Sequence, residues 1–168
     1  MKEECFSRFC EKNTVLKMSI KFRKAIEEEV RVLTAMSMDA FLSDVEFGGE
    51  PGGPTGYDDY EFHLSHQKNG DLYALLDDGK IVSGAILKLN EDSLYVYRIF
   101  VSSKEFHKGY GLKLMQSIEE YFPEAKGFKL DTPEWNSRTN SFYKKCGYVA
   151  VGKEHIPEFD LIIYEKKR

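Results

Sequence analysis

Three apolar runs joined by very short connections constrain the fold of this chain most strongly. The runs cover residues 72–76, 81–89 and 94–101, and only four residues separate each run from the next. The first connection contains Asp78 and Gly79, a pair that tolerates the positive φ angles of a tight hairpin turn. Because connections this short join antiparallel neighbours, the sequence predicts three consecutive antiparallel strands.

A helical pattern and another short apolar run follow these strands. Apolar residues recur at helical spacing at Leu112, Met115, Ile118 and Phe122, and residues 128–130 form the short run. A strand–helix–strand succession of this kind pairs its strands in parallel. The sequence therefore predicts an α/β (α+β) fold: a mixed, mostly antiparallel twisted sheet of about seven strands, with helices on both faces.

The remaining elements complete this prediction. They are strands at residues 19–24, 148–153 and 159–165, and helices at residues 25–41, 58–67 and 136–145. A stretch rich in glycine and proline between Phe47 and Tyr57 is predicted to be a loop. One domain over residues 18–168 accommodates all of these elements. Residues 1–17 lack a clear periodicity and are predicted to be an N-terminal extension.

Charge and cysteine content narrow the classes of function. The net charge of −4 does not favour a nucleic-acid-binding surface. No apolar run approaches the ~20 residues of a membrane helix, and no secretory signal opens the chain, so we expect a cytoplasmic protein without membrane contact. Three cysteines predict neither a disulfide framework nor a zinc site, and no metal is expected.

Two glycines between a predicted strand and a predicted helix mark the first candidate site. Gly109 and Gly111 follow the strand that ends at Val101. Glycine allows tight turns and close ligand approach, and the free N–H groups of a helix's first turn attract anions. We expect this segment to bind a phosphate or diphosphate, with further donors supplied by His107 and Lys108.

A second motif begins 25 residues after Gly111 and carries a family resemblance. Its residues are Asn136, Phe142, Tyr143, Lys145, Gly147 and Tyr148. Together with Val101, Gly109 and Gly111, they make the chain resemble the GCN5-related N-acetyltransferase (GNAT) superfamily, in element order from residue 19 to residue 166. Phe106 departs from the family pattern, which usually has Gln or Arg there, and Thr139 replaces a usual Ala.

The resemblance implies that acetyl-CoA lies in a cleft where the strands at residues 94–101 and 128–130 splay apart. The pantetheine arm would pair with the freed strand edge, and the diphosphate would bind amides of residues 106–111. A backbone N–H near Ile99 or Phe100 would polarise the thioester carbonyl. The residues implied to contact acetyl-CoA are Ile99, Phe100, Val101, Phe106, His107, Lys108, Gly109, Tyr110, Gly111, Leu112, Asn136 and Lys145.

The resemblance also implies catalytic residues. Tyr143 matches the position of the general acid that protonates the departing thiolate. Because neighbours on a helix point about 100° apart, we expect Phe142 to enter the core and Tyr143 to lie nearer the cleft. The strand at residues 94–101 contains no glutamate, so the general base is predicted to be Glu61, with His63 as the alternative.

Each charged residue near the predicted cleft has two possible roles. Strand alternation predicts Arg98 on one face with Val96 and Phe100, opposite Tyr95, Tyr97, Ile99 and Val101. There it forms either a structural ion pair or a clamp for a substrate carboxylate. Asp131 and Glu134 either attract a cationic amine or cap a turn. The loop at residues 47–57 is either a lid over the acceptor side or a plain connector.

The predicted function is transfer of an acetyl group from acetyl-CoA to a primary amine of a small molecule or peptide, by direct attack in a ternary complex. A second interpretation is a CoA-binding sensor or interaction module with the same fold and no turnover. A third is a nucleotide-binding regulatory domain that uses the glycine loop alone. The expected partners are acetyl-CoA and an amine acceptor, and a homodimer is left open.

Overall fold

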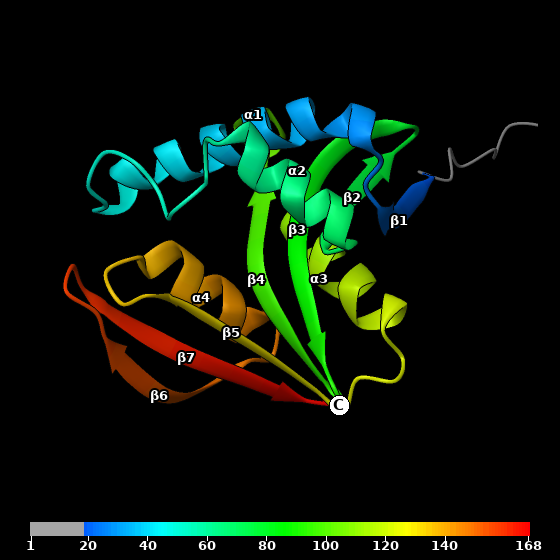
Figure 1. The fold of residues 1–168 in the computed structure, drawn as a ribbon. Helices are drawn as coiled ribbons and strands as arrows, with labels where there is room; N and C mark the ends of the chain where they lie inside the picture. Colours follow the sequence, from blue (N-terminus) through cyan, green and yellow to red (C-terminus); the bar gives the residue numbers. More distant parts are fainter. Residues whose placement is uncertain (1–18) are drawn as a thin grey trace, which may run out of the picture.

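Seven strands form one mixed sheet in the computed structural model, which describes residues 19–168 (Figure 1). The strands are β1 (Ile20–Lys24), β2 (Leu72–Asp77), β3 (Lys80–Asn90), β4 (Ser93–Val101), β5 (Gly127–Pro133), β6 (Val149–His155) and β7 (Asp160–Lys167). Their order across the sheet is β1-β2-β3-β4-β5-β7-β6. Among these strands only β4 and β5 pair in parallel, so the predicted mixed, mostly antiparallel sheet is confirmed. The predicted extension at residues 1–17 lies outside the described residues.

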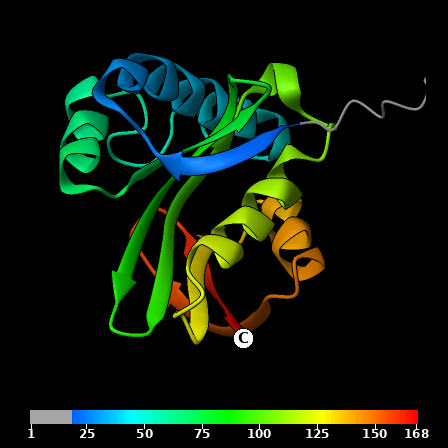
Figure 2. The same ribbon diagram turned by 90° about the vertical axis from the view of Figure 1, so that its right-hand side faces the viewer.

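Helices cover both faces of the sheet, as predicted. They are α1 (Val30–Leu42), α2 (Tyr60–Asn69), α3 (Tyr110–Tyr121) and α4 (Ser137–Lys145), with short 3-10 turns η1 (Glu27–Glu29), η2 (Ser43–Phe47) and η3 (Ser103–Glu105). One core cluster contains side chains of α1, α2 and the sheet, and a second contains side chains of α3, α4 and the sheet. Figures 1 and 2 show the two helical layers on opposite sides.

Local sequence signals account for the turns that shape this fold. Asp78 and Gly79 have φ angles of 47° and 80° and form the predicted tight turn between β2 and β3. Gly70 ends α2 in the left-handed conformation, the usual role of a glycine after a helix. The helix predicted from residue 25 starts later, because the 3-10 turn η1 precedes Val30.

A β-bulge in β4 reverses the alternation of its side chains. Val96 pairs with Leu87 and Arg98 pairs with Ile86, so Tyr97 is an extra residue in β4. An extra residue shifts all following side chains to the other face. The predicted alternation along β4 is therefore wrong from this point onward.

The bulge decides which β4 side chains meet which helical layer. Ile99 and Val101 pack against the core cluster of α3 and α4, which also holds Val96. Tyr97 and Phe100 pack on the side of α1 and α2. Ile99 and Val101 therefore do not share a face with Tyr97, contrary to the sequence prediction.

The sheet opens between β4 and β5. These strands pair only where Ser93–Tyr95 lies beside Gly127–Lys129, whereas β5 pairs with β7 from Gly127 to Pro133. Figure 1 shows β4 and β5 diverging from their common end near the C-terminus. The edge of β4 from residue 96 to residue 101 consequently has no strand partner on this side among the described residues. The splay expected from the family resemblance is present.

Candidate active site

The glycine loop at the end of β4 presents a run of free backbone donors. His107 and Gly109 both adopt positive φ, at 64° and 79°, and α3 begins directly after Gly109. Within residues 19–168, no acceptor of good geometry faces the amides of residues 107–112. Consecutive amides in such turns, together with a helix N-terminus, form a concave anion site. Of the amides predicted to bind the diphosphate, those of residues 107–111 are thus free, whereas the Phe106 amide donates to the Ser103 carbonyl at 3.3 Å.

The buried carboxylate of Glu105 stabilises this loop through two lysines. Glu105 accepts hydrogen bonds from Lys80 Nζ at 2.5 Å and from Lys108 Nζ at 2.8 Å. The two ammonium groups, Lys108 first, lower the pKa of Glu105 to about 2. The Tyr110 hydroxyl donates to Asp77 of β2. Lys108, predicted to contact the coenzyme, therefore braces the loop internally, whereas Lys80 and the Tyr110–Asp77 contact join the loop to the β2–β3 hairpin.

The burial of Phe142 and Tyr143 is the reverse of what the sequence predicted. Tyr143 is 7% exposed and belongs to the core cluster, whereas Phe142 is only partly buried. A Cβ atom at Gly111 would lie 3.2 Å from the Phe142 ring. The missing side chain at Gly111 therefore leaves room for Phe142 to cover the start of α3, and the prediction that Phe142 is the core member is wrong.

Tyr143 lies among aromatic rings, with its hydroxyl unbonded. Its ring centroid is 5.4 Å from that of Phe142 and 6.1 Å from those of Tyr148 and Tyr164. Burial raises the pKa of Tyr143, and the negative charge of Asp131 adds to that effect. The hydroxyl has no hydrogen-bond partner in the part of the chain that the structure describes. It stays protonated at neutral pH and is able to donate a proton.

Tyr95 and Asp131 face each other where the two strands separate. The Tyr95 hydroxyl of β4 donates to Asp131 of β5, and burial together with this contact raises the pKa of Tyr95. No Lys, Arg or His of residues 19–168 forms an ion pair with Asp131, whereas Glu134 pairs with Lys153 at 2.6 Å. Of the two acids predicted to attract an amine, only Asp131 keeps its charge unpaired.

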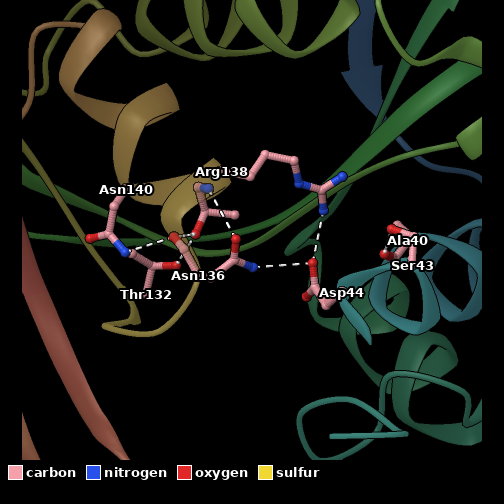
Figure 3. Close-up of polar contacts among 8 residues, drawn as sticks. Ala40, Ser43, Asp44, Thr132, Asn136, Arg138 and Asn140 are labelled. Atoms are coloured by element: carbon pink, nitrogen blue, oxygen red, sulfur yellow. Dashed lines mark hydrogen bonds and ion pairs between the residues drawn. The ribbon is translucent and has the colours of Figure 1, made fainter. Parts of the chain in front are cut away.

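A polar bridge joins α4 to the segment after α1 across the open side of the sheet (Figure 3). Asp44 Oδ1 accepts from Asn136 Nδ2 at 3.1 Å and from Arg138 Nη2 at 2.8 Å. Asn136 also caps α4, because its Oδ1 accepts from the Thr139 amide at 3.2 Å. Burial raises the pKa of Asp44, although both donors oppose this shift. The bridge uses both ends of the Asn136 amide within the protein.

The loop at residues 47–57, which is rich in glycine and proline, extends to the same side of the sheet as the Asp44 bridge. A Cβ atom at Gly49 would lie 2.7 Å from the Trp135 ring, just before α4. The Arg138 guanidinium lies 4.3 Å from the ring centroid of Phe47 and 5.2 Å from that of Phe106. The loop therefore packs on the β5–α4 connection, and Arg138 links it to the glycine loop.

Arg98 lacks the ion pair that was one of its two predicted roles. Its Nη1 donates to the Tyr97 carbonyl at 3.1 Å, and its guanidinium stacks on the Tyr97 ring at 4.2 Å. Nε is buried without a partner, and no carboxylate of residues 19–168 lies within ion-pairing distance. The structural ion pair is therefore wrong for the described chain.

The two candidate bases occupy different environments. His63 is buried, its Nδ1 lies 2.8 Å from the Asp59 carbonyl, and its ring packs 6.0 Å from Phe100. Burial lowers the pKa of His63, so it is neutral at pH 7. Glu61 is exposed in the first turn of α2, and its role as base stays a prediction.

Comparison with known proteins decides the family. Residues 37–148 match the family model described as the Acetyltransferase (GNAT) family. The chain belongs to the GNAT acetyltransferase family. It is 31% identical over 116 residues to the uncharacterized protein YrkN of Bacillus subtilis. The aligned segment covers 67% of this chain and 60% of YrkN. The chain thus spans less than two thirds of this relative's length.

Solved structures show the same GNAT fold. A PaiA N-acetyltransferase from Thermoplasma acidophilum, in complex with coenzyme A, superposes with a TM-score of 0.72 and 22% identity, over 90% of this chain and 100% of that one. A GNAT-family acetyltransferase from Streptococcus agalactiae gives a TM-score of 0.77 at 19% identity, over 89% and 95%. The family resemblance and the fold expected from it are both confirmed.

The other residues that the GNAT resemblance implied lie in different surroundings. Val101 and Ile99 are partly buried at the β4 edge, and Phe100 is buried on the opposite face. Leu112 is 47% exposed in the first turn of α3, and Lys145 is exposed in the last turn of α4. Their contacts with a coenzyme stay predictions.

No helix within residues 19–168 is long and apolar enough to cross a membrane. The same residues contain no group of three His, Cys, Asp or Glu side chains placed to hold a metal ion. The sequence did not point to Asp44 as a site residue. Asp44 follows α1 in a segment that carries no motif, and it lies 92 residues before its partner Asn136.

Proposed function

We propose that this chain is an N-acetyltransferase that moves the acetyl group of acetyl-CoA onto an amine within a ternary complex. One observation carries the proposal: the unpaired edge of β4 is followed, after the 3-10 turn η3, by the free amides of the glycine loop. Backbone groups cannot stay unpaired in a buried site. A ligand with an amide-rich arm and a diphosphate satisfies both parts at once, and acetyl-CoA has both.

The chain's own groups would divide the work of binding as follows. The amides of residues 107–112 hold the diphosphate, and the positive end of the α3 dipole adds to the attraction. The free edge of β4 pairs with the pantetheine arm, as an added strand pairs with a sheet edge. An N–H near Ile99 or Phe100 then donates to the thioester oxygen and stabilises the oxyanion that develops there.

The reaction itself moves three protons. An amine with a lysine-like pKa near ~10.4 must lose a proton before its nitrogen attacks the thioester carbon. As the C–N bond forms and the C–S bond breaks, the nitrogen releases a second proton to water and the thiolate takes one from the general acid. Tyr143 is the proposed donor to the thiolate, because its hydroxyl is unbonded and stays protonated. Glu61 is the proposed base.

Two measurements test this function. Saturating acetyl-CoA at 100 times its dissociation constant should stabilise the protein by ~2.7 kcal/mol, which raises the melting temperature by about 5–11 °C for a chain of this size. Thiol release with a panel of amines then measures turnover. Absence of any thermal shift would contradict the coenzyme assignment. If acetyl-CoA stabilises the protein but no amine in the panel causes release of free CoA thiol, the chain would be a CoA-binding module without turnover.

The Tyr143→Phe variant tests the proposed acid against a matched control. We expect turnover to fall by ~10²-fold or more, the usual contribution of a positioned proton donor, while acetyl-CoA affinity stays within twofold. Tyr148→Phe removes a hydroxyl from the same aromatic group, and that hydroxyl is buried without a partner, so turnover should be unchanged. Equal turnover in the two variants would remove Tyr143 from the mechanism.

A further inference from the structure

The guanidinium of Arg98 has donors that the protein leaves unused. An arginine side chain carries five N–H donors, and Arg98 makes one hydrogen bond, from Nη1 to the Tyr97 carbonyl. Nε is buried without a partner, and Nη2 forms no hydrogen bond within residues 19–168. Nε and Nη2 lie on the same edge of the guanidinium, so the free donors form the two-pronged fork that binds a carboxylate.

The free fork lies on the side of the sheet from which an acceptor would approach. The glycine loop, Phe142 and Tyr143 belong to the layer of α3 and α4. Arg98 stacks on Tyr97, which packs on the side of α1 and α2. A second substrate that meets the thioester in the split therefore enters from the face that carries Arg98.

An unpaired negative charge lies on the same face. In β5, Phe128, Leu130 and Thr132 alternate as buried residues, and the first two belong to the α3–α4 core. Asp131 therefore points to the opposite face, where it accepts from Tyr95. The Tyr95 and Tyr97 ring centroids are 6.1 Å apart. A continuous strip thus runs from the Asp131 carboxylate, over Tyr95 and Tyr97, to the Arg98 guanidinium.

Both ends of this strip are charged, of opposite sign, and unpaired. Partly buried charges without a partner are costly unless a ligand completes them. We propose that the acceptor is an amine that also carries a carboxylate: the fork of Arg98 binds the carboxylate, and the Asp131–Tyr95 pair binds the amine nitrogen. This inference rests on the proposed acetyl transfer and names the class of its acceptor, an amino acid or a short peptide.

Matched acceptor pairs test the proposal directly. Each pair contains an amino acid or dipeptide and its carboxamide, which keeps the amine and the size but removes the negative charge. We expect kcat/KM for the carboxylate member to be about 10- to 100-fold higher, the range of a charge-assisted bidentate contact. Arg98→Gln should lower the carboxylate member to the level of its amide and leave the amide unchanged.

A matched control and a readout without turnover accompany these rates. Lys88 is the other cation beside Tyr97, with Nζ 4.7 Å from the ring centroid, and Lys88→Gln should keep the preference of the wild type. In the presence of CoA, which cannot transfer an acetyl group, the carboxylate members should raise the melting temperature and their amides should not. In the Arg98→Gln variant, the carboxylate members and their amides should give the same melting temperature. Acetyl-CoA should still stabilise this variant, which shows that the variant is folded.

The outcomes separate this inference from the proposed function. Equal rates for both members of each pair, or a preference that persists in Arg98→Gln, would overturn the carboxylate assignment and leave acetyl transfer intact. Faster acetylation of a phosphorylated amine than of any carboxylate member would likewise overturn it. No thermal shift with acetyl-CoA would overturn the proposed function itself.

Discussion

Two substitutions of Asp44 should have different consequences for stability. Asp44→Ala removes the acceptor of two hydrogen bonds, from Asn136 Nδ2 and Arg138 Nη2. The Arg138 side chain is 32% exposed and is able to turn to water. Asn136 is 1% exposed, so its amide nitrogen would be left buried and unbonded. An unsatisfied buried donor costs ~1–3 kcal/mol, and we expect Asp44→Ala to lose about 2 kcal/mol, or about 4–8 °C in melting temperature.

Asp44→Asn keeps the acceptor oxygen and removes the charge. Burial raises the pKa of Asp44 above its ordinary value of 3.8, so the folded protein favours the protonated side chain. The stability that comes from protonation is fully present below pH 3.8 and is lost as pH rises through the folded pKa. At pH 7 the neutral asparagine avoids this loss, and we expect a stability within about 0.5 kcal/mol of the wild type or above it.

Urea unfolding of the three proteins at pH 7, followed by circular dichroism, measures both effects. The expected order of midpoints is Asp44→Asn equal to or above wild type, and Asp44→Ala clearly below both. An Asp44→Asn variant as unstable as Asp44→Ala would refute the reasoning, because the charge of Asp44 rather than its acceptor oxygen would then hold the bridge.

Two further predictions concern the glycine loop. The lowered pKa of Glu105 means that its carboxylate contributes stability above pH 4.5 that is lost as pH falls towards 2; the urea midpoint of the wild type should therefore fall more steeply over this range than that of Glu105→Gln, and parallel curves would contradict the pairing with the two lysines. Gly109→Ala and Gly79→Ala both place a side chain at a φ near 80° in open space, so each should cost ~1–2 kcal/mol. Only Gly109→Ala should weaken acetyl-CoA binding in a thermal-shift titration, and an equal loss in the control would show that the loop conformation does not hold the ligand.

The sequence predicted the elements whose signals are local. The Asp78–Gly79 turn and Gly109 each fix a backbone conformation within a few residues and lie where expected, whereas Gly111, also expected before the helix, lies in the first turn of α3. The order of strands and helices follows from these points together with the apolar spacing. The glycine loop was therefore accessible from sequence as a candidate anion site.

Features that depend on distant residues were not accessible in the same way. The bulge at Tyr97 is set by the pairing of β4 with β3, and strand alternation carries no sign of it. The choice between Phe142 and Tyr143 depends on the space left at Gly111, 31 residues before Phe142. Asp44 meets partners more than 90 residues away, and the free fork of Arg98 is visible only once the carboxylates of residues 19–168 have been placed.

The chain path through the sheet bears on when the split between β4 and β5 forms during folding. Strands β1 to β4 and strands β5 to β7 form two groups, which meet through only three residue pairs. Pairings between segments close along the chain are favoured early, because they close smaller loops. The junction of the two groups needs the whole α3 crossover in place. A molecule halted just before that junction would hold most of its secondary structure and still have no cavity to offer a coenzyme.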